Sequence, residues 1–407
     1  MRKYKRIKKC RSCNSKKLTP ILNLGKIYVS DFVASFSKRG RIPLELILCE
    51  DCNLLQLRHT TNPDLLYREY WYKSSINETI IADLKDITSK AEEQIKLKEG
   101  DIVIDIGCND GTLLRSYKTK GLKLVGFEPA LNLIKEAKQG TTKIIPNYFS
   151  FKLFRRYFND HKAKVATSIA VFYDLDNPNK FVDDITKCLD KEGLWIIEMR
   201  YLPLMLQQND IGNCCHEHVE YYSLISLKNL LDRHSLEIVD VELNDVNGGS
   251  LRAYIRFKNK FPIHPNVNEL LEKEKKDRLN ELDPYSMFAY RVYMIKQELY
   301  DFIKKEHDAG KKIFVYGAST KGNTMLQYFG IDHKLIEAAA ERDSRKFGMK
   351  TIATEIPIIS EEEARKNADY FLILPWHFLD AFIKREKEFL SSGGKFIVPL
   401  PEFKVLP

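Results

Sequence analysis

The sequence predicts an α/β protein with three parts: a small cysteine-containing module, a large doubly wound α/β domain and a second, smaller α/β unit. Two pairs of closely spaced cysteines stand near the start of the chain. Further on, apolar runs suited to buried parallel strands alternate with amphipathic segments of helical length. A strand followed by a glycine-containing turn occurs twice in this pattern. The 407 residues suffice for three such parts, and we expect divisions at 1–73, 74–259 and 260–407.

The composition is that of an ordinary globular protein. Hydrophobic residues make up 44% and charged residues 30% of the chain, and the formal net charge is +9. Much of the positive charge lies in residues 1–9, which favours a solvated terminus over a nucleic-acid-binding segment. A positive balance also suits an anionic small substrate. No run approaches the roughly 20 apolar residues of a membrane span, and no signal peptide is indicated, so we expect a cytoplasmic protein.

The first part of the chain has the cysteine spacing of a metal site. Cys10 and Cys13 form one Cys-x-x-Cys pair, and Cys49 and Cys52 form another. Each pair aims two thiolates at one point, so two pairs complete a tetrahedral zinc site. Four unrelated reduced cysteines are the alternative. A site with four thiolates has no open coordination position, so we expect the zinc to be structural, within a segment of short strands and turns.

The second part begins with a helix and continues as alternating strands and helices. Apolar residues recur at helical spacing from residue 80 to about residue 97. Buried strands are predicted at 101–107, 123–128, 165–168 and 194–198, each separated by segments of helical length. This alternation is typical of a doubly wound sheet.

A nucleotide-binding loop follows the first of these strands. The strand delivers Asp105, and the glycines at positions 107 and 111 allow the backbone to turn sharply beneath a ligand. The second strand ends in Glu128, where a carboxylate can accept both hydroxyls of a ribose. The spacing Asp-x-Gly-x-x-x-Gly favours S-adenosylmethionine over NAD, since Gly-x-Gly-x-x-Gly is missing. We therefore assign Asp105, Gly107, Asn109, Gly111 and Glu128 to the cofactor.

A dense group of titratable residues lies at positions 214–223. His216, Glu217 and His218 are adjacent, with tyrosines at positions 221 and 222. The spacing differs from the i, i+4 arrangement that places two imidazoles on one helix face, which argues against a metal site. Because ligands bind beyond the carboxyl ends of strands in α/β folds, the group indicates an acid–base site.

The remaining segments complete the α/β pattern. Residues 246–252 read as a tight turn between two strands, and residues 265–306 as charged helix with a possible break at Asp283-Pro284. A second strand and glycine loop follow at 313–323, where the start of a helix together with Lys321 suits a phosphate group. A structural turn is the alternative there. Further strands are expected near the C-terminal end of the chain.

Taken in order, these motifs resemble the family of nucleotide-sugar C-methyltransferases over nearly the whole chain. The resemblance rests on the paired cysteines, the Asp-x-Gly loop, His-Glu-His-x-x-Tyr-Tyr-Ser, Asn-Gly-Gly-Ser-Leu-Arg, Tyr-Gly-Ala-Ser-Thr-Lys-Gly-Asn-Thr, Glu-Arg-Asp, Ile-Leu-Pro-Trp and Gly-Gly-Lys-Phe-Ile-Val-Pro. It implies a zinc-binding module, a class I (Rossmann-like) methyltransferase domain that uses S-adenosylmethionine, and a C-terminal Rossmann-like α/β module.

The resemblance also implies a reaction and its residues. A base removes a proton next to the ketone of a nucleoside-diphosphate keto-deoxysugar, and the enolate is methylated, in deoxysugar or surface polysaccharide biosynthesis. The expected catalytic residues are His218 as the base, Glu217 beside it and Tyr222 as a hydroxyl. The expected substrate-binding residues are Tyr72, His216, Asn247, Ser319, Lys321 and Asn323. A monomer with no nucleic-acid or membrane partner is expected.

The chain departs from the family pattern at two positions. Cys215 stands where relatives have a tyrosine before His-Glu-His, and Ala170 stands where they have an asparagine followed by a His-x-Pro stretch. Tyr72, Tyr173 or one of the tyrosines at 221 and 222 could supply the missing hydroxyl. Methylation of an oxygen or nitrogen of a sugar nucleotide is therefore an alternative, and nucleic-acid methylation is a more distant one.

Overall fold

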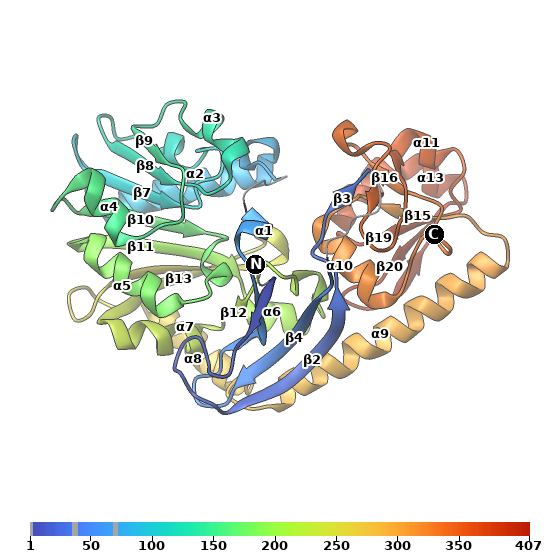
Figure 1. The fold of residues 1–407 in the computed structure, drawn as a ribbon, viewed down its shortest axis with the longest axis horizontal. Helices are drawn as coiled ribbons and strands as arrows, with labels where there is room; N and C mark the ends of the chain where they lie inside the picture. The colour runs from blue at the N-terminus through green and yellow to red at the C-terminus, as the bar shows by residue number, and fades with distance from the viewer. Residues whose placement is uncertain (1–2, 35–39, 68–71) are drawn as a thin grey trace.

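The computed structural model describes residues 3–34, 40–67 and 72–407. Two α/β units lie side by side, and the N-terminal module runs along both of them (Figure 1). The α/β class and the three-part arrangement predicted from the sequence are confirmed.

The central unit is built on a seven-stranded sheet. The strand order is β13-β14-β11-β10-β7-β8-β9, and β14 runs antiparallel between two strands of the opposite direction. The apolar runs form the middle strands because both sheet faces are covered and every position of β7 is buried. The strands are β7 (Ile102–Ile106), β8 (Lys123–Phe127), β9 (Lys143–Ile145), β10 (Ala163–Ile169), β11 (Leu189–Arg200), β13 (Leu236–Asn244) and β14 (Ser250–Phe257).

Helices cover both faces of this sheet (Figure 1). The helices of the central unit are α2 (Glu78–Gln94), α3 (Ile134–Ala137), α4 (Phe151–Phe158), α5 (Pro178–Cys188), α6 (Leu202–Gln207), α7 (Leu224–Leu231) and α8 (Pro265–Lys276). The side chain of Asn77 caps α2 by accepting the backbone N–H of Thr79, and the helix ends before Ile95, which is extended. The Glu274 carboxylate of α8 accepts two backbone N–H groups at the start of α7. Helix α8 therefore packs on the central unit, beyond the division expected at residue 260.

The N-terminal module is more extended than the sequence indicated. Its elements are β1 (Tyr4–Arg6), β2 (Leu18–Ile27), β3 (Phe32–Val33), β4 (Ile42–Cys49), β5 (Leu55–Leu57), β6 (His59–Thr61) and α1 (Asp64–Tyr67). Strand β2 is a long strand rather than a short one, because register shifts near Pro20 and Gly25 absorb both residues. Strand β5 pairs with β12 (Glu220–Tyr221) of the central unit, and β3 pairs with β17 (Lys350–Thr351) of the C-terminal unit.

The C-terminal unit has a six-stranded sheet in the order β18-β16-β15-β19-β20-β21. Its strands are β15 (Ile313–Tyr316), β16 (Ala339–Glu341), β18 (Ile358–Ser360), β19 (Tyr370–Ile373), β20 (Lys395–Val398) and β21 (Lys404–Leu406). Its helices are α9 (Asp283–Asp308), α10 (Thr320–Phe329), α11 (Glu361–Arg365), α12 (Leu379–Arg385) and α13 (Lys387–Ser391). The strand order reverses between β15 and β19, so a crevice for ligands is expected beyond the carboxyl ends of these two strands.

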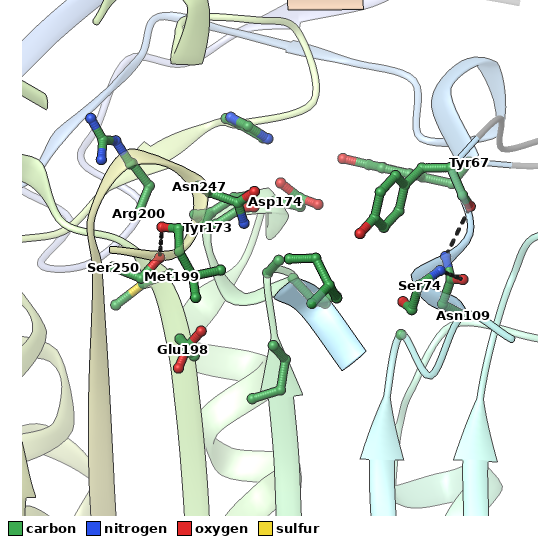
Figure 2. A pocket seen from close by; sticks show the side chains of 18 of the residues that line it. Tyr67, Ser74, Asn109, Tyr173, Asp174, Glu198, Met199, Arg200, Asn247 and Ser250 are labelled. Atoms are coloured by element: carbon green, nitrogen blue, oxygen red, sulfur yellow. Dashed lines mark hydrogen bonds between the residues drawn. The ribbon is translucent and has the colours of Figure 1, made fainter. Parts of the chain in front are cut away.

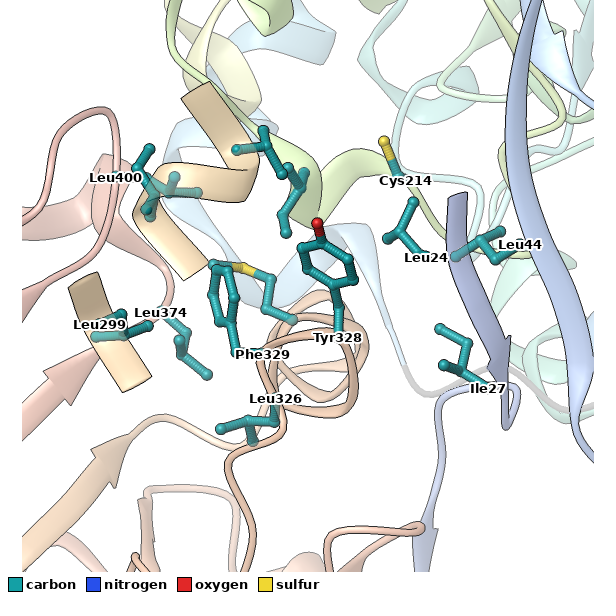
Figure 3. Close-up of a cluster of buried hydrophobic side chains, with 14 of the residues drawn as sticks. Leu24, Ile27, Leu44, Cys214, Leu299, Leu326, Tyr328, Phe329, Leu374 and Leu400 are labelled. Carbon is teal, nitrogen blue, oxygen red and sulfur yellow. The ribbon is translucent and has the colours of Figure 1, made fainter. Parts of the chain in front are cut away.

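One hydrophobic core joins the three parts. Leu24 and Leu44 of the N-terminal hairpin, Cys214 of the central unit and Tyr328 of α10 belong to the same cluster (Figure 3). The burial of these apolar groups stabilises the packing of the central unit against the C-terminal unit. Among the helices that the structure describes, none has the combination of length and apolar character that a membrane span requires.

Candidate active site

A cavity of about 590 Å³ lies between the carboxyl ends of the parallel strands of the two sheets. Residues from both α/β units and from the N-terminal module line it. The lining residues used below are Tyr72, Glu128, Asp174, Arg200, His218 and Lys321. The cavity thus combines the ligand-binding edges that the topology of each sheet provides.

The predicted nucleotide loop forms one end of the cavity. Gly107 has φ of +72°, and a Cβ atom there would meet Cγ2 of Val171 at 2.3 Å, so glycine is required for the close approach. The Asp105 carboxyl accepts a hydrogen bond from the Thr167 hydroxyl at 2.6 Å. Burial raises the pKa of Asp105 to about 7. Gly111 has another reason to be glycine: a Cβ would lie 3.0 Å from the carbonyl oxygen of Ala137.

Glu128 lies beside this loop, at the end of the second strand. One carboxylate oxygen accepts the backbone N–H of Asn109 at 2.8 Å, and the other accepts that of Ala130 at 2.7 Å. Burial raises the pKa of Glu128 to about 7. Each carboxylate oxygen has further lone pairs, so the group can accept two ribose hydroxyls in the cavity. The arrangement therefore fits an adenosyl group.

The side chain of Asn109 ties the N-terminal module to the loop. Its Oδ1 accepts the backbone N–H of Ser74 at 3.0 Å, and its Nδ2 donates to the carbonyl of Tyr72 at 3.2 Å (Figure 2). The amide thus holds Tyr72 at the rim of the cavity. Asn109 acts through its backbone on Glu128 and through its side chain on this segment.

His218 is one of the residues that line the cavity. Its Nδ1 is 2.9 Å from the carbonyl oxygen of Asn213, which can only accept, so Nδ1 carries the hydrogen and Nε2 keeps a lone pair. Its ring packs edge-on against Tyr173, with centroids 4.4 Å apart. Burial and the charge of Lys321 together lower the pKa of His218 to about 3, against the opposing effect of the bond to Asn213. The imidazole is therefore neutral at physiological pH and can accept a proton at Nε2.

Two residues near His218 in sequence lie away from the cavity. The Nε2 atom of His216 is 3.2 Å from the carbonyl of Ile42, and its side chain is buried against the N-terminal module. The Tyr222 hydroxyl donates to Glu220 at 2.9 Å within the core. The structure therefore does not bring His216 and Tyr222 into the cavity lining, and their polar groups have partners elsewhere.

Glu217 is adjacent to His218 but is not among the cavity-lining residues. Its backbone carbonyl accepts the hydroxyl of Tyr67 at 3.0 Å. Burial raises the pKa of its carboxyl group. A role for Glu217 in tuning its neighbours remains a proposal.

The glycine loop of the C-terminal unit forms the other end of the cavity. The Ser319 hydroxyl accepts the backbone N–H of Gly322 at 3.0 Å and caps α10, and Lys321 lines the cavity. Asn323, in contrast, donates from Nδ2 to the carbonyl of Asp31 at 2.9 Å, away from the cavity. The structure therefore does not bring Asn323 into the cavity lining, and its side chain links the N-terminal module to α10. Asn247 lines the cavity from the β13–β14 turn.

The arginine of the Asn-Gly-Gly-Ser-Leu-Arg motif lies beneath the cavity floor. Arg252 is buried and forms ion pairs with Glu198 and Asp83, each at 2.7 Å, and with Asp86 at 2.6 Å. Glu198 and Asp83 reach the cavity, so Arg252 orients two of its acidic lining residues and ties α2 to the sheet. In the turn that precedes Arg252 in this motif, Asn247 has a left-handed backbone conformation, with φ of +55°.

Three charged or polar residues of the cavity wall were not predicted from the sequence. Asp174 follows β10, Arg200 ends β11 and pairs with Asp210 at 3.1 Å, and His377 follows β19. Their shared signal is a position just beyond the carboxyl end of a parallel strand. Ala170 also lines the cavity, with φ of +53°, a conformation that asparagine adopts more readily than alanine.

The four predicted zinc cysteines come together. Their sulfur atoms all lie within 4.8 Å of one another, with 3.6 Å between Cys10 and Cys52 and 3.5 Å between Cys13 and Cys49. A zinc tetrahedron with 2.3 Å bonds has edges of about 3.8 Å, so the cluster fits this metal. Asn229 of α7 donates to the carbonyl of Cys52 at 3.3 Å, which docks the site on the central unit. None of the four cysteines lines the cavity, and four thiolates leave a zinc ion no open coordination position, so the site fits a structural zinc.

The fold and the loop at Glu128 define a class I S-adenosylmethionine-dependent methyltransferase. Comparison with protein-family models supports this class: residues 76–241 match a methyltransferase domain and residues 10–67 a zinc binding domain. Residues 245–401 match a C-methyltransferase C-terminal domain. The chain is 31% identical over 367 residues to the C-methyltransferase NovU of Streptomyces niveus, covering 89% of this chain and 87% of that protein. The chain therefore belongs to this family of zinc-binding C-methyltransferases.

Solved methyltransferases resemble part of the chain. An S-adenosylmethionine-dependent methyltransferase from Clostridium acetobutylicum is 15% identical, with a TM-score of 0.35, and the match covers 44% of this chain and 92% of that one. The plantazolicin methyltransferase BpumL in complex with SAH is 16% identical, with a TM-score of 0.34, and the match covers 48% and 80% of the two chains.

Proposed function

We propose that the enzyme methylates a carbon atom of a nucleoside-diphosphate keto-deoxysugar, with His218 as the base. The main support is the contact between Nδ1 of His218 and the carbonyl oxygen of Asn213, which leaves the Nε2 lone pair free to accept a proton. His218 lines a cavity that is also lined by Glu128 and Lys321. A neutral imidazole held in one orientation suits the removal of a proton from the carbon next to a ketone.

Residues of the central unit hold the cofactor. Glu128 binds the ribose, and Gly107 lets the backbone lie close beneath the ligand. When bound, S-adenosylmethionine supplies an electrophilic methyl group. The protein then needs mainly to position the substrate and to generate the nucleophilic carbon, which is the role of His218.

Residues of the C-terminal unit suit the anionic part of the substrate. Ser319 and Lys321 lie at the start of α10, where backbone N–H groups and the helix dipole favour a phosphate group. The charge of Lys321 also lowers the pKa of His218. A bound diphosphate offsets this charge, so His218 becomes a stronger base when the substrate is in place.

The proposal includes the setting of the enzyme. We place it in deoxysugar or surface polysaccharide biosynthesis in the cytoplasm. One hydrophobic cluster joins the three parts, and residues of all three parts of one chain line the cavity, which supports a monomer. Light scattering would then give a mass of 47.4 kDa, and a mass of twice this value would contradict the monomer.

Product analysis tests the reaction. The enzyme is mixed with S-adenosylmethionine labelled with carbon-13 in the methyl group and with a panel of nucleotide-linked 4-keto-6-deoxysugars. We expect the label on a ring carbon, with the rate lowered at least 100-fold in His218→Ala and unchanged in the control His264→Ala, which is exposed. A label on oxygen or nitrogen would replace carbon methylation by the alternative reaction.

A further inference from the structure

Asp174 lines the cavity, and one of its two carboxyl oxygens has no partner among the described residues. It ends the short 3-10 turn Phe172–Asp174, directly after β10, and its side chain lines the cavity. Within the part of the chain that the structure describes, its buried Oδ1 atom has no hydrogen-bond partner. A buried polar atom without a partner is costly, and in an enzyme cavity a bound ligand commonly completes it.

The turn that carries Asp174 is held next to His218. The backbone carbonyl of Tyr173 accepts the N–H of Val219 at 2.9 Å, and the Tyr173 ring packs against the imidazole. Figure 2 shows the Asp174 carboxyl group beside Tyr173, pointing into the space between it and Tyr67. Asp174 and His218 are therefore fixed on one wall of the cavity, within reach of one small ligand.

The groups around Asp174 favour its protonated form. Burial raises the pKa of Asp174 well above its ordinary value, and the carboxyl groups of Glu217 and Glu220 raise it further. The hydroxyl of Tyr67 opposes this effect. The neutral imidazole of His218 adds no positive charge that would ionise the acid. The balance of these effects favours the protonated form of Asp174, whose O–H can donate a hydrogen bond.

We propose that Asp174 is a catalytic residue that donates a hydrogen bond to the keto oxygen of the substrate and to the enolate oxygen formed from it. This inference rests on the proposed function. Two other candidate donors are engaged by protein groups: the Tyr222 hydroxyl bonds to Glu220, and Arg200 is paired with Asp210. Ala170 and Cys215, the two departures from the family pattern, offer no strong donor to the cavity.

The step balances without a further reactant. The proton next to the ketone moves to Nε2 of His218, and the electron pair of the broken C–H bond forms a C=C bond. The carbonyl π pair moves to oxygen, where the O–H of Asp174 stabilises the negative charge. Asp174 keeps its proton throughout. The C=O bond forms again when the carbon accepts the methyl group, and His218 releases its proton to water.

Hydrogen exchange measures this step without methyl transfer. The enzyme, S-adenosylhomocysteine and the keto-sugar nucleotide are incubated in D₂O, and incorporation of deuterium next to the ketone is followed by mass spectrometry. We expect Asp174→Leu to lower the exchange rate about 100-fold to 1000-fold, the effect of removing one oxyanion donor. Asp174→Asn stays within about tenfold of the wild type, because the amide also donates. The matched control is Asp184→Asn, a buried aspartate that pairs with Lys180 away from the cavity.

Two results would overturn the inference. Exchange in Asp174→Leu within threefold of the wild type would show that no donor is lost. Exchange in Asp174→Asn as slow as in Asp174→Leu would show that an ionised carboxylate is required. Binding of S-adenosylhomocysteine and zinc content identify any variant that fails to fold. A wild-type enzyme that exchanges no keto-sugar would overturn the proposed function itself, and this inference with it.

Discussion

The two α/β units place a glutamate at the same topological position but use it differently. Glu128 follows β8 and Glu341 ends β16, which is the second strand of each unit along the chain. Each carboxylate accepts a backbone N–H from the glycine loop after the first strand, from Asn109 at 2.8 Å and from Ala318 at 3.1 Å. The local backbone geometry of the two loops is therefore closely related.

The difference lies in the charge around each carboxylate. Lys346 contacts Glu341 at 3.0 Å and also donates to the carbonyl of Ala318. For Glu128, no such cation is present among the residues that the structure describes, and this carboxylate faces the cavity. An unpaired buried carboxylate is suited to ligand hydroxyls, whereas a paired one stabilises its own loop. The topology of the sheet thus determines where a ligand-binding carboxylate can lie. The presence or absence of a counter-ion determines whether that carboxylate can bind a ligand.

The largest expected effect is on how the free energy of unfolding depends on pH. The pKa of Glu128 rises from 4.5 to about 7 on folding, so the ligand-free folded protein holds this proton more tightly than the unfolded chain. Its stability therefore falls as pH rises from about 4.5 to 7, by about 3 kcal/mol for this group. Between pH 5 and pH 8 this group accounts for about 2.5 kcal/mol, so the difference in unfolding free energy measured by urea denaturation should be smaller by about this amount in Glu128→Gln than in the wild type.

Glu341→Gln is the matched control for this measurement. Lys346 neutralises the Glu341 carboxylate, so the difference in unfolding free energy between pH 5 and pH 8 should stay at the wild-type value. An equal loss of pH dependence in both variants would remove the distinction between the two glutamates.

A smaller effect is expected on cofactor affinity. Hydrogen bonds to a charged group contribute about 1.5–3 kcal/mol, so Glu128→Gln should raise the Kd for S-adenosylhomocysteine about 10-fold to 100-fold. Glu341→Gln should leave this Kd within threefold, because its carboxylate does not reach the cavity. Isothermal titration calorimetry compares the variants at pH 8. A Kd unchanged in Glu128→Gln would show that the ribose binds elsewhere.

Residues whose role depends on a short, regular stretch of chain could be predicted from the sequence. The loop from Asp105 to Gly111 follows directly from a buried strand, and the carboxylate of Glu128 ends the next strand. The zinc cysteines were predictable for the same reason, since each pair forms its own tight turn.

Residues in irregular backbone could not be assigned in this way. His216 and His218 are two positions apart, yet one faces the N-terminal module and the other the cavity. Outside helices and strands there is no period from which the facing side can be derived. The environment of Asp174 is likewise assembled from distant segments, because Glu217 and Tyr67 reach it only in the folded chain.

A crystal structure with S-adenosylhomocysteine and uridine diphosphate tests the division of labour between the two units most directly. We expect the adenosine ribose to bond to the carboxylate of Glu128 and the diphosphate to lie at Ser319 and Lys321, so that both ligands enter one cavity from opposite ends. A diphosphate bound outside this cavity, or a ribose bound at Glu341, would contradict the account.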